Sequence, residues 1–242
     1  MKLLQANIWG GRLSNQLIDI LAKEKADILC FQEIISTKGD GFIFETLENI
    51  KKQLGYEYSF FSPVFDINLM QKTAGFGNAI LSKLPFESTN TVFTRLEHKN
   101  NFDFDLDDYN IRNFQHASIN INGQLLHVLN HHGHHVHQNK NGDKETMRQC
   151  GIIADYIKQL KGAVILVGDF NLAPHSESLE QINGILRNLS VKFDLKTTRT
   201  SLTNKTEVCD YIFVSEDIKV TEFFASDDIF SDHKALILEF SI

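Results

Sequence analysis

The stretch IRNFQHASININGQLLHVLN (residues 111–130) decides the fold, because it predicts an antiparallel hairpin in a chain that otherwise alternates strands with helices. Asn122–Gly123 is the turn signal, and strand-forming runs flank it on both sides. The run AVILV (163–167) is apolar at every position, so it predicts a strand buried on both faces. A hairpin excludes a purely parallel sheet, and a strand that is apolar on both faces must be covered on both faces by other elements. Together they favour two packed sheets with helices outside.

The other predicted elements precede and follow this hairpin in the sequence. Gly10–Gly11 ends the first strand, and Ser14 is the expected N-cap of the helix that follows, with Leu17, Ile20 and Leu21 on its apolar face. Further strands are expected at 2–8, 26–32, 56–61, 77–82, 208–214, 218–225 and 234–240, and further helices at 43–54, 144–160 and 176–189.

Length and composition favour a single domain over residues 1–242. The chain is 42% hydrophobic with only three prolines, and it contains no repeat and no Pro, Gly or Ser-rich linker. The three cysteines are an odd number in apolar runs, so we expect reduced core thiols. No apolar run approaches the about 18 residues of a transmembrane segment. The start MKLLQANIWGG turns polar too early for a secretory signal. We therefore expect a cytoplasmic monomer.

The charge balance limits how the protein can hold a polyanion. Lys and Arg number 24 against 31 Asp and Glu, which gives a net charge of −7 with neutral histidine. Proteins that bind nucleic acid mainly through charge carry a basic excess, and this chain does not. If it handles phosphates, divalent cations in an acidic site must supply much of the neutralisation.

Polar side chains gather where the predicted strands begin or end. A single Asp or Asn at a strand end is usually a turn former. Several together are harder to explain in that way, because a buried charge is costly unless it is paired or bound to a metal. The positions are Asn7, Glu33, Asn130 to His132, Asp169 and Asn171, Asp210, and Asp232–His233.

These residue types match the needs of phosphate ester hydrolysis. That reaction needs a cation on the phosphoryl oxygens, an activated water, and donors toward the developing negative charge. Hard oxygen ligands select Mg²⁺ or Mn²⁺ over Zn²⁺, and Asn7, Glu33 and Asp232 would provide them.

The same residues, taken in order, resemble a known family. The ordered set is Asn7, Gln32–Glu33, GNAILSK (77–83), N-x-H (130–132), GDFN (168–171), DYIFVS (210–215) and SDH (231–233). It is similar to the endonuclease/exonuclease/phosphatase superfamily, which includes nucleases, sphingomyelinases and inositol phosphatases. The resemblance runs from residue 3 to 240. It implies a four-layered α/β sandwich, with two mixed, mainly antiparallel sheets packed face to face, helices outside, and the site at one sheet edge.

The resemblance also implies roles for individual residues. Glu33 would be the principal Mg²⁺ ligand, with Mn²⁺ as a substitute ion, and Asn7 and Asp232 would assist the metal. The implied catalytic residues are Asp169 for the attacking water, Asn171 as a donor to phosphate, His233 on the scissile phosphate, Asp210 fixing the His233 tautomer, and His132 as a second cationic donor.

Five features leave alternatives open. His131 could replace His132, although strand alternation favours His132, which shares a face with Asn130. The loop histidines His134, His135 and His137 either bind a transition metal such as Zn²⁺ or form a solvated loop. FDFDLDDY (102–109) resembles the start of a calcium loop but fits an edge strand or loop better. Arg112 either reaches a phosphate or forms a surface ion pair, and Trp9 lines the cleft or belongs to the core.

These observations predict a Mg²⁺-dependent phosphoesterase that hydrolyses phosphodiester bonds by direct attack of activated water. Its partner would be a phosphate-ester substrate, with nucleic acid first among the candidates, so a nuclease is the leading hypothesis. A lipid or small-molecule phosphodiesterase or phosphatase of the same superfamily is the second. A catalytically silent binding protein on this fold is the alternative from another class.

Overall fold

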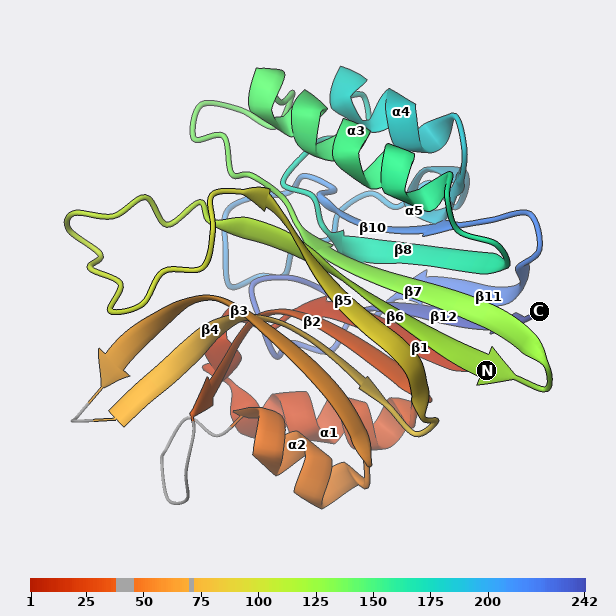
Figure 1. The fold of residues 1–242 in the computed structure, drawn as a ribbon, viewed down its shortest axis with the longest axis horizontal. Helices are drawn as coiled ribbons and strands as arrows, with labels where there is room; N and C mark the ends of the chain where they lie inside the picture. The colour runs from red at the N-terminus through yellow and green to blue at the C-terminus, as the bar shows by residue number, and fades with distance from the viewer. Residues whose placement is uncertain (38–45, 70–71) are drawn as a thin grey trace.

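The computed structural model describes residues 1–37, 46–69 and 72–242, and two six-stranded sheets pack face to face in it (Figure 1). The strands of the first sheet are β1 (Lys2–Asn7), β2 (Ile28–Thr37), β3 (Tyr58–Leu69), β4 (Lys72–Ser82), β11 (Lys219–Ala225) and β12 (Leu236–Ser241). Those of the second are β5 (Phe86–Arg95), β6 (Arg112–Ile121), β7 (Gln124–His132), β8 (Ala163–Asp169), β9 (Arg187–Asn188) and β10 (Asp210–Val214). Their orders are β11-β12-β1-β2-β4-β3 and β5-β6-β7-β8-β10-β9.

Helices cover the outer face of each sheet, which confirms the predicted four-layered α/β sandwich (Figure 1). Helices α1 (Ser14–Glu24) and α2 (Thr46–Leu54) lie on the first sheet, and α3 (Lys144–Ile157), α4 (Glu180–Asn183) and α5 (Leu189–Lys192) lie on the second. Short 3₁₀ turns occur at Trp9–Gly11 and Glu177–Leu179. None of the helices in the described residues is long and apolar enough to span a bilayer.

Strand alternation explains the layers. Leu3 faces the core between the two sheets, whereas its neighbour Leu4 faces the core under α1 and α2, and both are fully buried. A third core joins α3 to the second sheet, with Leu166 of β8 among its members. Each large apolar side chain buried in this way contributes about 1.5–3 kcal/mol of transfer free energy. Strands apolar on both faces can therefore be stable only in the middle of such a sandwich.

The hairpin that decided the fold is present with its predicted register. Ile121 pairs with Gln124, and Asn122 and Gly123 both have positive φ (53° and 89°), as a type I′ turn requires. After the hairpin, the chain crosses over through α3 and returns as β8, parallel to β7. Asp143 caps α3, because its side chain accepts from the backbone N–H groups of Glu145 and Thr146.

Several local predictions were wrong. Residues 176–189 do not form one helix but a 3₁₀ turn, the short α4 and the strand β9, because Gly184 ends α4 after a single turn. Ser14 is the first residue of α1 and makes no capping bond. Strand β5 was not predicted, since its sequence FESTNTVFTR is mostly polar and it lies at a sheet edge. Residues 43–45 of the helix predicted over 43–54 lie outside the described residues.

The connectivity brings the polar strand ends to one edge. β1 and β2 are parallel, as are β7 and β8, so their carboxyl ends point the same way. β10 is antiparallel to β8, and β12 is antiparallel to β1, so the amino ends of β10 and β12 meet those carboxyl ends. Asn7, Glu33, His132, Asp169 and Asp210 are therefore delivered to one edge from strands far apart in the sequence.

Candidate active site

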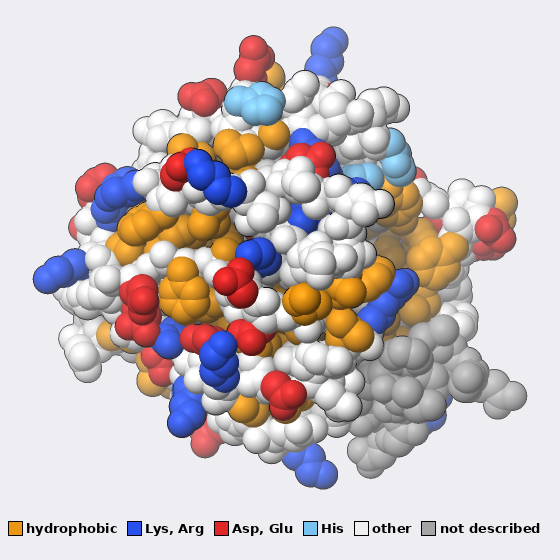
Figure 2. Space-filling view, turned by 180° about the vertical axis from the view of Figure 1, so that it is seen from behind, with side chains coloured by type: hydrophobic (Ala, Val, Ile, Leu, Met, Phe, Trp, Pro, Cys, Tyr) orange, Lys and Arg blue, Asp and Glu red, His pale blue; other side chains and the backbone are white. Residues whose placement is uncertain are grey.

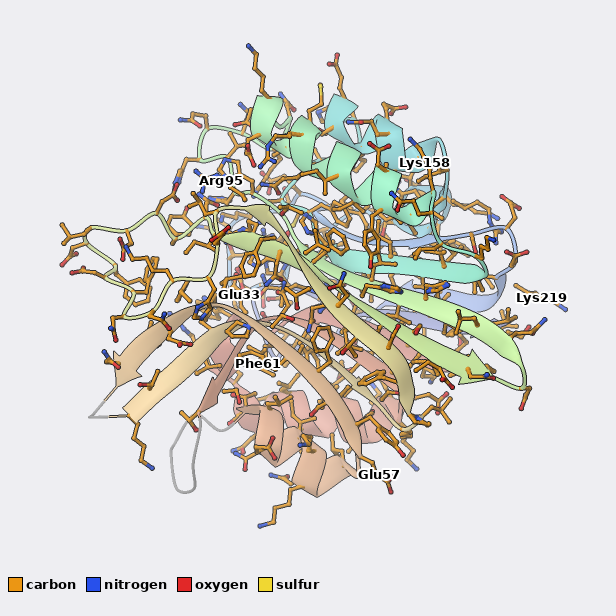
Figure 3. The ribbon with its side chains drawn as sticks, viewed as in Figure 1. Glu33, Glu57, Phe61, Arg95, Lys158 and Lys219 are labelled. Atoms are coloured by element: carbon orange, nitrogen blue, oxygen red, sulfur yellow. The ribbon has the colours of Figure 1, made fainter. Side chains whose placement is uncertain are left out.

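A cleft of about 390 Å³ opens at this edge of the sandwich, between β3–β4 and the connection from β5 to β6. In Figure 3, Glu33 lies at the left side of the sheets, below that projecting connection. The lining residues include Glu33, His132, Asp169, Asn171, Asp232 and His233, which the sequence analysis singled out. Trp9 also lines the cleft, so it is not a core residue.

A backbone irregularity aims Glu33 into the cleft. The pairing of β2 with β4 shifts register between Phe31 and Ile34, and Glu33 within this bulge has a φ of 56°. Positive φ is uncommon and strained for a residue other than glycine, and bulges re-aim side chains next to functional sites. The Glu33 side chain is 26% exposed, and burial raises its pKa, although the hydrogen bond from Asn7 opposes this.

Asn7 joins two acidic groups from different sheets. Its Nδ2 donates to Glu33 Oε1 at 2.9 Å and to Asp169 Oδ2 at 3.2 Å, while its Oδ1 accepts from the backbone N–H of Trp9 at 3.1 Å. Asp169 Oδ1 accepts from the backbone N–H of Asn171 at 2.9 Å. The two carboxylates thus face one another across a single amide, with oxygens available to a hard cation.

His233 and Asp210 form a buried pair beside Asp169. His233 Nδ1 lies 2.8 Å from Asp210 Oδ2, and His233 Nε2 lies 3.5 Å from Asp169 Oδ2. Burial would lower the pKa of His233, but Asp210 and Asp169 together raise it well above its usual value. The imidazole is therefore charged at neutral pH and presents Nε2–H to the cleft.

A ladder of buried amides holds this pair from behind. Gln5 Nε2 donates to Asp210 Oδ1 at 3.2 Å and to Gln32 Oε1 at 2.8 Å, and Gln32 Nε2 donates to Asn130 Oδ1 at 2.5 Å. Asn130 in turn donates to Gln115 Oε1 at 3.1 Å. All four amide side chains are fully buried, so each must be paired within the protein. This ladder accounts for Asn130, whose side chain serves the interior and not the cleft.

His132 lies in the cleft but is not the cation that was expected. Its Nε2 is 3.9 Å from Glu33 Oε1 and 4.0 Å from Asp169 Oδ2. Burial and the neighbouring charge of Arg112 lower the pKa of His132 well below its usual value, so the imidazole is neutral near pH 7. His131 points away, as strand alternation predicted, and packs edge-on against Phe170.

Cations that the sequence analysis missed surround the site. Arg199 is only 4% exposed, lines the cleft and pairs with Asp232 Oδ2 at 3.2 Å. Lys140 Nζ donates to Asn171 Oδ1 at 2.6 Å, and Lys205 also lines the cleft. Nothing in the sequence singled out these three residues, because each lies in a polar loop whose path only the tertiary structure defines.

Asp169 is ionised in this setting. Burial alone would raise its pKa, but the charges of His233, Arg199 and Lys140 lower the pKa far below the usual value of 3.8. Asp169 therefore remains a carboxylate throughout the physiological range. A carboxylate with so low a pKa accepts a hydrogen bond from a water molecule well but is a weak base.

The sequence matches one family model over most of its length. The family model described as "Endonuclease/Exonuclease/phosphatase family" matches residues 4–233. The chain belongs to the endonuclease/exonuclease/phosphatase family. Enzymes of this family hydrolyse phosphoester bonds and generally use a divalent metal. No curated protein matches the chain in a sequence search.

Solved structures of family members share the fold at low sequence identity. An endonuclease/exonuclease/phosphatase from Beutenbergia cavernae has a TM-score of 0.75 and 14% identity, over 99% of this chain and 71% of that chain. The mannosyl-6-phosphatase of Bacteroides thetaiotaomicron has a TM-score of 0.71 and 17% identity, over 100% of both chains. TDP2 from D. rerio, complexed with single-strand DNA product, has a TM-score of 0.73 and 15% identity, over 100% of this chain and 99% of that chain.

Two groups of side chains in the site are chemically able to hold the metal that such enzymes use. Within the described ranges, ligand-type atoms of Asp169, Cys209, Asp210 and His233 lie within 4.8 Å of one another. In that group, however, His233 is charged, Asp210 is already bonded to it, and burial raises the pKa of the Cys209 thiol. Glu33 and Asp169 offer hard oxygen atoms, and Glu33 is a largely buried carboxylate whose neighbour His132 is neutral and cannot balance its charge. This second set fits a divalent cation better.

The loop histidines do not converge as a three-ligand set. His134 Nε2 lies 3.8 Å from Asp143, whereas His135 Nδ1 and His137 Nε2 lie 3.1 Å and 2.9 Å from the hydroxyl of Tyr109. His134 therefore faces a different partner from His135 and His137, which does not favour a transition-metal site built from all three.

The acidic segment FDFDLDDY forms turns and not a strand, and three of its four carboxylates accept hydrogen bonds or pair with cations. Asp107 pairs with Lys99, Asp108 accepts from Arg95 at 2.6 Å, and Asp103 accepts from the backbone of Asp105 at 2.9 Å. These bonds explain the segment without calcium.

Proposed function

We propose that this protein is a Mg²⁺-dependent phosphoesterase that hydrolyses phosphodiester bonds by direct attack of water, with nucleic acid as the first candidate substrate. The observation that carries the proposal is the meeting of Asn7, Glu33 and Asp169 with the His233–Asp210 pair in one cleft. These groups provide hard oxygen ligands, a carboxylate for water and a charged donor for phosphate within a few ångströms of one another.

The metal would be held by Glu33 and Asp169, while Asn7 would assist by holding both carboxylates through its Nδ2. When bound, it supplies positive charge to the phosphoryl oxygens and to the leaving oxygen. Asp232 is the other metal ligand that the resemblance implies, but its Oδ2 already pairs with Arg199 and is less available to a metal. Mn²⁺ would substitute, because it accepts the same oxygen donors.

Asp169 orients the attacking water. Because the pKa of Asp169 is strongly lowered, its carboxylate is a weak base. The attacking water therefore gives up its proton late, after the forming P–O bond has made that proton acidic. As this bond forms, the bond from phosphorus to the leaving oxygen breaks; the proton of the water passes through Asp169 to solvent, and the leaving oxygen takes up a proton from solvent. No covalent enzyme intermediate is needed.

His233 and Asn171 stabilise the phosphate. The charged imidazole of His233 donates through Nε2 to a phosphoryl oxygen, while Asp210 holds Nδ1 and the amide ladder holds Asp210. Asn171 Nδ2 donates to the carbonyl of Gly133 at 3.3 Å, which fixes the amide at the rim of the site. Preorganised donors of this kind act without reorganisation cost at the moment of reaction.

An aromatic wall supports a single-stranded nucleic acid as substrate. Phe76 and Phe104 line the cleft beside Trp9, and Phe104 is 68% exposed; Phe65 lies buried behind them, stacked on Phe76 at 5.0 Å. Bases stack on such rings with about 1–3 kcal/mol each. On the face shown in Figure 2, basic and acidic side chains are interspersed, which does not favour a long duplex track.

A small phosphate ester is the second candidate. The chain as a whole carries a net charge of −7, but Arg199, Lys140 and Lys205 gather positive charge at the cleft, where it can neutralise a phosphate group. A cleft of about 390 Å³ also has the size of a small-molecule site.

The deciding experiment compares wild-type protein with Asp169→Ala and His233→Ala on bis-p-nitrophenyl phosphate in Mg²⁺. Each variant should lose about 10²–10⁴-fold in kcat. Wild-type rates in either variant would overturn the proposal. A panel of single- and double-stranded DNA, abasic DNA, RNA, sphingomyelin, inositol phosphates and sugar phosphates would then separate the two candidate substrate classes.

A further inference from the structure

Arg199 is fixed next to the catalytic pair by the backbone. It forms an isolated β-bridge with His233. On either side of this bridge, the backbone N–H of Lys234 donates to Thr198 O at 2.8 Å and that of Thr200 donates to Asp232 O at 3.1 Å. A position held by main-chain bonds on both sides can present a side chain reproducibly, which is what a preorganised site needs.

The Arg199 guanidinium keeps donors to spare. Its Nη1 pairs with Asp232, and its Nε is buried without a hydrogen-bond partner among the described residues. The guanidinium is a permanent cation, because an arginine side chain is not deprotonated in proteins, and the carboxylates of Asp169, Asp210 and Asp232 favour its charge. An unpaired buried N–H is costly unless a ligand satisfies it.

The other buried arginine of the cleft has most of its donors engaged. Arg112 donates to the carbonyl oxygens of Gly133, Tyr109 and Ile111 and to the side chain of Asn110, which uses four of its five N–H donors. These bonds support the cleft wall. Arg199, by contrast, has a buried Nε without a partner among the described residues and lies against His233.

The Arg199 guanidinium meets a ring nitrogen of His233. Its Nη1 contacts His233 Nε2 at the wall of the cleft, and its buried Nε–H has no partner among the described residues. An acceptor that enters the cleft at this point would satisfy the guanidinium. A phosphoryl oxygen is such an acceptor, and Arg pairs with it through strong charge-assisted bonds. Asp169 Oδ2, which orients the water, lies 3.5 Å from the same His233 nitrogen.

We propose that Arg199 is a catalytic residue that donates to a non-bridging oxygen of the scissile phosphate beside His233, and that Asp232 is a positioning residue that holds Arg199. This inference rests on the proposed phosphoesterase function. It replaces neutral His132 with Arg199 as the second cation of the site. It also moves Asp232 from the metal to the arginine.

The test uses Arg199→Ala, Arg199→Lys and Asp232→Asn, with Arg148→Ala as the surface-arginine control. With bis-p-nitrophenyl phosphate and Mg²⁺, Arg199→Ala should lower kcat about 10²–10³-fold, and Arg199→Lys should retain more activity. Added guanidinium ion should restore part of the rate in Arg199→Ala and none in Arg148→Ala. Wild-type kcat in Arg199→Ala would refute the role. If the alanine variant does not fold, the lysine variant decides: wild-type kcat and phosphate affinity there would equally refute it.

Two binding measurements separate this inference from the proposed function. Calorimetry with inorganic phosphate should show affinity weakened about 10- to 100-fold in Arg199→Ala, even if no phosphodiester is turned over by the wild type. Calorimetry with Mg²⁺ should show unchanged affinity in Arg199→Ala and Asp232→Asn. Equal phosphate affinity in wild type and Arg199→Ala would contradict the arginine's role. A loss of Mg²⁺ affinity in Asp232→Asn would return Asp232 to the metal.

Discussion

Replacing Asp210 with asparagine isolates what the buried carboxylate does for His233. Asp210 is fully buried and accepts from His233 Nδ1 at 2.8 Å and from Gln5 Nε2 at 3.2 Å. Asparagine keeps the shape but removes the charge that raises the pKa of His233. A hydrogen bond to a charged group is worth about 1.5–3 kcal/mol. Since one pKa unit is about 1.4 kcal/mol, the pKa of His233 should fall by about one to two units.

The sign of the effect follows from which form is active. The imidazolium is the active form, so kcat/KM falls as pH rises through the pKa of His233. Lowering that pKa moves the alkaline limb of the profile to lower pH by the same amount. The ion pair also stabilises the fold below about pH 6.5, the ordinary histidine value, and this contribution is lost as pH rises through the raised pKa.

The assay is the pH dependence of kcat/KM for bis-p-nitrophenyl phosphate in Mg²⁺, with the His233 titration followed by NMR. Asp228→Asn, an exposed carboxylate paired with Lys23, is the matched control. Urea unfolding separates a kinetic effect from loss of structure, because the new amide also meets the Gln5 donor. An alkaline limb that stays in place while the His233 resonance shifts would refute the assigned role of the imidazolium.

Three further predictions follow from single contacts. Glu33→Gln should weaken Mg²⁺ binding about 10- to 100-fold by calorimetry, whereas Glu239→Gln at the surface should not; equal affinities would remove Glu33 from the metal site. Gly168→Ala should lower the free energy of unfolding by several kcal/mol, because φ is 149° and a Cβ would lie 1.8 Å from the carbonyl oxygen of residue 131; a wild-type urea midpoint would contradict this. Asn130→Leu should cost about 1–3 kcal/mol for each buried partner left unpaired, and an unchanged urea midpoint would show that the amide ladder does not stabilise the fold.

The fold was largely predictable because it depends on local pattern. The turn at Asn122–Gly123 and the doubly apolar run 163–167 each correspond to one backbone conformation and one degree of burial, and both are present as predicted. The failures were at places where local pattern is weak. Strand β5 is polar because it lies at a sheet edge, and residues 176–189 carry helical periodicity that the chain interrupts at Gly184.

The candidate site was predictable to the extent that its residues abut apolar strands. Asp169 and Asp210 could be noticed because a charge beside a buried strand needs an explanation. Arg199 and Lys140 could not, because they lie in polar loops whose sequence resembles any solvated surface. The neutral state of His132 could not be predicted from the sequence either, since it depends on burial and on the charge of Arg112. Arg112 is far from His132 along the chain and comes near it only when β6 pairs with β7.

By itself, the amino-acid sequence determined most of the segments that become strands, the one at 163–167 that is buried on both faces, and the polar side chains that stand at strand ends, because these properties follow from residue order and side-chain chemistry. Only the tertiary structure decided that the ends of β1, β2, β7, β8, β10 and β12 meet at one edge, that a bulge turns Glu33 inward, and that Arg199 touches His233. Those outcomes depend on strand pairing and on electrostatic fields between groups far apart in the chain. A pKa and a shared ligand are properties of such neighbours in space, not of neighbours in sequence.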